Sequence, residues 1–255
     1  MDTKKRAYAI VILIFLIAAF GIVYIFSELS TEDELADALV TDAKIFKEEY
    51  ENENNKELED GTKLLSLNIE EENPIIYKEA KDIVEMINNK ESFYVFFSYS
   101  TCSWCRNILP SLLESAKENE VDKIYYVDIA NIRDTYELDE DHKPIRKSEG
   151  SEAYYKLLEM LDYILDDYTP LTYTTSKGKT KKVKVDEKRI YAPTLIGIKD
   201  GEAKLKTSGV LAEQTDPNIK QTQEQLVLSK YEFKCVFDST KETSTDTCVC
   251  VDKKC

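Results

Sequence analysis

The chain has 255 residues, 42% of them hydrophobic, which is enough apolar sequence for one folded core with appendages. Its net charge at pH 7 is −15. This acidic balance excludes a typical nucleic-acid-binding protein, which needs a basic face, and it disfavours a domain lying flat on an anionic lipid surface.

The N-terminal segment, residues 1–26, predicts a membrane anchor. Basic residues 4–6 precede an uncharged apolar stretch over 7–26. A helix of ~20 residues spans about 30 Å, the thickness of a bilayer core, and the basic cluster predicts a cytoplasmic N-terminus with the rest of the chain outside. A cleaved signal peptide is the alternative, with 19–21 as a small-x-small cleavage site, although the apolar run continues past it.

The next segment, 27–62, is rich in Glu, Asp, Asn and Lys. Its apolar residues fall at helical spacing, namely Leu35, Leu39, Ala43, Phe46 and Tyr50. This pattern predicts an amphipathic helical stalk, free or packed on the domain, that ends in a polar linker over 51–55.

Residues 63–234 show the pattern of a folded α/β domain. The first signals in chain order are a strand over 64–69, a helix over 75–89, a strand over 92–100, a helix over 103–119 and a strand over 123–129. This β-α-β-α-β order predicts parallel strands joined by crossover helices.

An insertion over 131–188 interrupts this pattern. It is expected to hold a helix near 151–166 and a hairpin around 176–179, and either to shape a substrate surface or to cap one sheet edge. Strands over 194–198 and 203–206 then flank an Asp200-Gly201 turn, and a last helix starts near Thr222.

The sequence Cys102-Ser103-Trp104-Cys105 stands where an apolar strand turns into a helix. Two sulfurs at this spacing can meet across one helical turn, and a helix N-terminus favours the thiolate that attacks disulfides. Half of a zinc site and a structural disulfide are the alternatives. Zinc would need further cysteines or histidines at ligand spacing, and the one histidine, His142, stands in an acidic loop where a solvated side chain is expected.

The other four cysteines crowd into the C-terminal tail, 235–255: Cys235, Cys248, Cys250 and Cys255. Outside the membrane such cysteines form structural disulfides, and the sequence leaves all three pairings open. A second redox pair at Cys248 and Cys250, or a metal site with C-x-C spacing, are the alternatives.

Three of these features together resemble the thioredoxin superfamily. The C-x-x-C follows an apolar strand, Pro110 stands five residues after Cys105, and the segment 190–202 looks like the one that carries the family's cis-proline and last hairpin. The resemblance covers roughly 64–130 and 188–232. It implies a thioredoxin-like α/β fold, a cis Ala192–Pro193 bond, and a loop there that lies against the C-x-x-C and binds substrate backbone. Membrane-anchored thioredoxin-like proteins of bacteria are similar in layout.

The chain also departs from the family. Thioredoxin itself has W-C-G-P-C, whereas here Trp104 lies inside the motif and the proline is absent. The buried aspartate that thioredoxin carries six residues before its first cysteine is Phe96 here. Proton transfer must therefore use water or another group, and the redox potential does not follow from the resemblance.

The expected activity is extracytoplasmic thiol–disulfide exchange with cysteine-containing proteins, aided by a membrane or extracytoplasmic redox partner. Cys102 attacks and Cys105 resolves, Arg106 adds nearby positive charge, and the substrate-binding candidates are Trp104, Ala192 and Pro193. No cofactor or metal is implied. Oxidation, reduction and isomerisation all remain open. A non-catalytic accessory module, for example in peptide or bacteriocin export, is the main alternative, and copper delivery is disfavoured by the scarcity of histidine.

Overall fold

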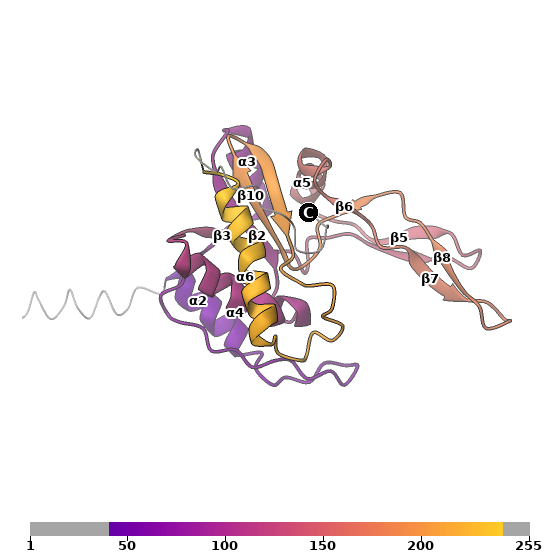
Figure 1. Cartoon of the computed structure of the whole chain (residues 1–255). Coiled ribbons are helices and arrows are strands. Elements are labelled where there is room, and N and C mark those ends of the chain that lie inside the picture. The colour runs from indigo at the N-terminus through magenta and orange to yellow at the C-terminus, as the bar shows by residue number, and fades with distance from the viewer. Residues whose placement is uncertain (1–40, 242–255) are drawn as a thin grey trace, which may run out of the picture. The chain divides into compact units, whose positions relative to one another are not determined.

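A five-stranded mixed sheet organises the part of the chain that the computed structural model describes, residues 41–241 (Figure 1). The strand order is β1 (Ile75–Tyr77), β3 (Ile124–Asp128), β2 (Phe93–Ser98), β10 (Thr194–Lys199), β11 (Glu202–Thr207). The first three strands are parallel, and β10 and β11 are antiparallel to their neighbours. The predicted α/β class with crossover-linked parallel strands and a terminal hairpin is thus confirmed at this level.

Helices cover both faces of this sheet. Helices α3 (Ala80–Asn88) and α5 (Glu152–Leu161) pack on one face, where the core includes Val95 and Phe97. On the other face, α2 (Asp42–Glu51), α4 (Ser103–Glu118) and α6 (Gln223–Asp238) pack around Phe96. Because side chains alternate along a strand, neighbouring residues of β2 serve two separate cores.

The segment 64–69 is not the predicted strand. It carries no ladder, and side chains hold its backbone instead of a neighbouring strand. Asn54 contacts both the N–H and the C=O of Leu67, at 2.8 and 2.9 Å, and Glu51 accepts from the N–H of Ile69 at 2.7 Å. The edge strand of the sheet is instead β1, Ile75–Tyr77, which follows this segment in the chain. The predicted helix over 75–89 therefore begins only at Ala80.

The described part of the predicted stalk is a layer of the domain. Phe46 and Tyr50 of α2 are fully buried, and their rings lie 5.1 and 6.3 Å from the ring of Tyr126 in β3. The domain thus begins at α2 and not at residue 63. The predicted anchor over 7–26 lies outside the described residues, and within 41–241 no helix is both long and apolar enough to cross a bilayer.

The insertion caps the free edge of β11. The hydroxyl of Tyr163, just after α5, contacts the N–H of Ala203 at 2.7 Å and its C=O at 3.3 Å, while Lys206 pairs with Asp166 at 2.6 Å. The rest of the insertion forms three two-stranded ribbons: β4 (Thr135–Leu138) with β5 (Pro144–Ser148), β6 (Asp166–Asp167) with β9 (Lys188–Arg189), and β7 (Leu171–Thr174) with β8 (Thr180–Val183).

Candidate active site

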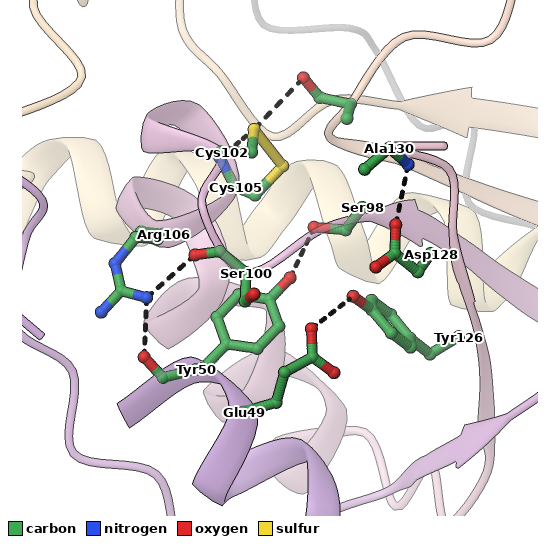
Figure 2. The surroundings of a disulfide bond; sticks show 11 residues. Glu49, Tyr50, Ser98, Ser100, Cys102, Cys105, Arg106, Tyr126, Asp128 and Ala130 are labelled. Carbon is green, nitrogen blue, oxygen red and sulfur yellow. Dashed lines mark hydrogen bonds between the residues drawn. A yellow bond between two sulfur atoms is a disulfide. The ribbon is translucent and has the colours of Figure 1, made fainter. Parts of the chain in front are cut away.

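Cys102 and Cys105 form a disulfide at the start of α4 (Figure 2). Cys102 is the N-cap, and its Sγ accepts the backbone N–H of Cys105 at 3.1 Å. A sulfur in this position faces unpaired N–H groups and the positive end of the helix dipole, which stabilise a thiolate. Cys102 is 6% exposed and Cys105 is fully buried, so Cys102 is the more accessible of the two residues.

The loop before β10 lies against this disulfide. The Ala192 carbonyl oxygen is 3.6 Å from the Sγ of Cys102, across 90 residues of sequence, and the Ala192–Pro193 bond is cis. Pro193 is buried and lines a cavity of about 760 Å³ together with Tyr191 and Leu211. The two predicted substrate-binding residues of this loop therefore stand beside the cysteines. Trp104 is half-buried in the first turn of α4.

Arg106 does not point to solvent and does not face substrate. Its side chain is fully buried beneath the redox turn. The guanidinium donates to the carbonyls of Tyr50 at 2.7 Å, Ser100 at 3.0 Å and Leu65 at 2.8 Å, and to Oδ1 of Asn54 at 2.6 Å. Burial lowers its pKa from the usual arginine value. Arg106 thus fastens α2 and the 64–69 segment to the loop that carries Cys102.

A network of hydroxyl and carboxylate side chains lies near the disulfide (Figure 2). Phe96 of β2 is buried in the core. Two residues further along β2, Ser98 is fully buried and shares a 2.7 Å hydrogen bond with the hydroxyl of Tyr50. Glu49, half-buried on α2, accepts from the hydroxyls of Tyr77 and Tyr126.

Sequence reasoning missed this network. Tyr50 was assigned to the stalk, and Ser98 was hidden in an apolar strand run. The one usable signal was the polar Ser98 within a run otherwise suited to the core. Burial raises the pKa of Tyr50 above the ordinary tyrosine value of 10.0, and it raises those of Tyr77 and Tyr126 as well. These phenols therefore stay protonated in the folded protein.

This raised pKa predicts alkaline instability. The folded state keeps the Tyr50 proton to higher pH than the unfolded chain does. The stabilisation is therefore complete below pH 10 and declines as pH rises from 10 toward the folded pKa. Each such tyrosine lowers the free energy of unfolding by up to about 1.4 kcal/mol per pH unit in this range. We expect Tyr50→Phe to reduce the slope, measured by urea unfolding of the oxidised protein between pH 8 and 11. Tyr231→Phe, a 39% exposed tyrosine on α6, should leave it unchanged. Equal slopes for both variants would contradict the expectation.

The remaining predicted residues fall elsewhere. Cys235 is buried on α6 and is disulfide-bonded, whereas Cys248, Cys250 and Cys255 lie outside the described residues. His142 is exposed in the β4–β5 loop, and its ring stacks on that of Tyr173 with 3.7 Å between the ring centres. Over residues 41–241, no group of three or more His, Cys, Asp or Glu side chains is placed to hold a metal ion.

The chain matches no family model. It also matches no curated protein.

Proposed function

We propose that this chain is a thiol–disulfide oxidoreductase of the thioredoxin superfamily, held outside the membrane by residues 7–26. The observation that carries the proposal is the position of Cys102, which caps α4, bonds to Cys105 and lies 3.6 Å from the carbonyl oxygen that precedes the cis-proline. Pro110 within α4 and the β10–β11 hairpin after Pro193 add support, because both stand where the resemblance requires them.

The proposed reaction is a pair of thiolate displacements. The Cys102 thiolate attacks one sulfur of a substrate disulfide, forms a new S–S bond, and expels the other substrate sulfur as a thiolate that takes up a proton. Cys105 then loses its proton and attacks the sulfur of Cys102, which closes the Cys102–Cys105 disulfide and releases the second substrate thiolate. The second substrate thiolate also takes up a proton. Counting the proton that Cys102 loses when it ionises, two electrons and two protons pass from the dithiol to the substrate, and oxidation of a substrate runs the same steps backward.

Each neighbouring group has a role in these steps. The helix N-terminus stabilises the Cys102 thiolate, and the N–H of Cys105 donates directly to its sulfur at 3.1 Å. The Ala192 carbonyl accepts from the thiol when Cys102 is protonated. The cavity that Pro193 lines is the candidate site for a substrate side chain.

An equilibrium redox titration tests the proposal. The full chain is equilibrated with glutathione or dithiothreitol buffers, and the Cys102–Cys105 state is read by mass after thiol alkylation. A reversible two-electron transition is expected, with a potential of about −270 mV for a reductase or about −120 mV for an oxidase. A pair that shows no reversible interconversion is structural, and the chain is then the non-catalytic accessory module.

A further inference from the structure

Five lysines are concentrated in and beside the β7–β8 hairpin: Lys177, Lys179, Lys181, Lys182 and Lys184. All five are exposed. No acidic residue stands between 171 and 185, although the whole chain carries a net charge of −15. The hairpin is therefore a strongly cationic element on an acidic protein, and it extends away from the five-stranded sheet (Figure 1).

These charges are also uncompensated. Elsewhere in the described chain lysines commonly pair with acids, as Lys206 does with Asp166 at 2.6 Å and Lys188 with Asp167 at 3.0 Å. In the hairpin, Lys184 pairs with Asp186 at 3.1 Å. Within residues 41–241, the other four lysines of the group form no ion pair. A set of unpaired like charges is a ready site for an anionic partner.

One face of the hairpin lies against the neighbouring β4–β5 ribbon, and the opposite, outward face is polar. Tyr173, opposite Lys181, stacks on His142 of the neighbouring β4–β5 ribbon. The other face carries Thr172 and Thr174 opposite Lys182 and Thr180. None of the large apolar side chains that are exposed in the described chain lies in this hairpin. A protein partner would call for an aromatic or apolar anchor, and an inserted membrane element would call for Trp, Phe or Leu, so the face fits a purely ionic contact.

The length of the hairpin separates its tip from the acidic body. The four strand residues Leu171–Thr174 span about 10 Å, at ~3.3 Å per residue, and the turn that carries Lys177 and Lys179 follows them. The Debye length at physiological salt is about 8 Å. Repulsion by acidic residues at the base of the hairpin is therefore reduced by screening at the tip, whereas the acidic loop over 139–141 lies closer, because His142 stacks on Tyr173.

We propose that the tip of the β7–β8 hairpin docks on the headgroup surface of an anionic lipid bilayer. The tip is convex, which suits a flat charged surface, whereas a linear polyanion is better held in a groove. Each lysine near such a surface strengthens binding about fivefold, so four give roughly 600-fold. That is enough to orient a chain that a membrane segment already tethers. The inference rests on the anchor over 7–26 and not on thiol–disulfide exchange, which the redox titration tests separately.

Lysine footprinting of the full chain in vesicles tests this docking. The chain is reconstituted in phosphatidylcholine vesicles with or without 30% phosphatidylglycerol, and acylation of each lysine is followed by mass spectrometry. We expect the four unpaired hairpin lysines to react at least threefold more slowly in the anionic vesicles, and 0.5 M salt should abolish the difference. Exposed Lys63, Lys123 and Lys220 should react equally in both.

A pair of variants separates the hairpin from overall charge. In the unchanged chain we expect the neighbouring Lys184 to share this protection, and in a chain with Lys177, Lys179, Lys181 and Lys182 changed to Gln it should lose it. The matched variant changes four exposed lysines outside the hairpin to Gln, namely Lys63, Lys90, Lys123 and Lys220, and should keep it. Equal labelling in both lipids, slowing of all lysines alike, a chain that stays off both kinds of vesicle, or protection by soluble polyphosphate in place of vesicles would each overturn the proposal.

Discussion

We expect Cys105→Ser to accumulate mixed disulfides between Cys102 and substrate proteins, and Cys102→Ser to form none and to exchange disulfides only at the uncatalysed rate. Cys102 is the more exposed sulfur and has the helix N-terminus to stabilise its thiolate. Cys105 is fully buried, so it can resolve an intermediate on Cys102 but cannot begin one. Without Cys105 the second displacement has no nucleophile, and the intermediate persists.

The trapped species are measured on non-reducing gels and by mass spectrometry, after cells are quenched with acid and free thiols are alkylated. The double variant, with both cysteines changed to Ser, is the matched control for adducts formed through the tail cysteines. Adducts that reach Cys105 in the Cys102→Ser variant would reverse the assigned roles. Full biological function in Cys102→Ser, with the fold intact, would favour the accessory module.

Arg106→Met destabilises the domain by about 3 kcal/mol or more, which is a large part of the 5 to 15 kcal/mol typical of a folded domain. The substitution keeps much of the apolar stem but leaves the carbonyls of Ser100 and Leu65 without their donor, and the Tyr50 carbonyl keeps only the N–H of Glu53, at 3.2 Å. Each buried acceptor left unpaired costs about 1 to 3 kcal/mol. Arg106→Lys recovers part of the loss, because an ammonium replaces some of these bonds but cannot reproduce the planar fork.

Urea unfolding of the oxidised protein measures this loss. Arg133→Met is the control, since that guanidinium lies 5.2 Å from the ring centre of Tyr99 and its removal should cost about 1 kcal/mol or less. If the two variants lose the same stability, then Arg106 does not hold the N-terminal layer on the redox turn.

Much of the central sheet followed from apolar runs. Strands β2, β3 and β10 are mostly buried segments, and they lie within two residues of the predicted ranges. Strand β1 was missed because three residues are too few to show a period, and Ile76 also fits a helical face. The 64–69 segment has the composition of a strand, but Asn54 and Glu51 satisfy its backbone, and no local pattern reveals such distant partners.

The candidate site also has a part that the sequence predicts and a part that it does not. The cysteines and Ala192 were predictable, because a motif and a resemblance point to them, and the structure brings them together. The positions of Arg106 and Tyr50 were not predictable. Whether an arginine next to a motif faces solvent or the core depends on what covers it, and here the cover is α2, a helix that sequence alone assigned to a stalk.

The 90-residue separation between Cys102 and Ala192 also sets the order of assembly. At about 5 to 20 residues per second, a ribosome needs roughly 5 to 20 s to make the intervening chain. During that interval both cysteines exist while the carbonyl and the proline loop that flank them do not. Cys102 and Cys105 are close enough in sequence to pair with each other as soon as α4 forms. The nascent chain can thus carry its disulfide before the loop that lies against it has been made.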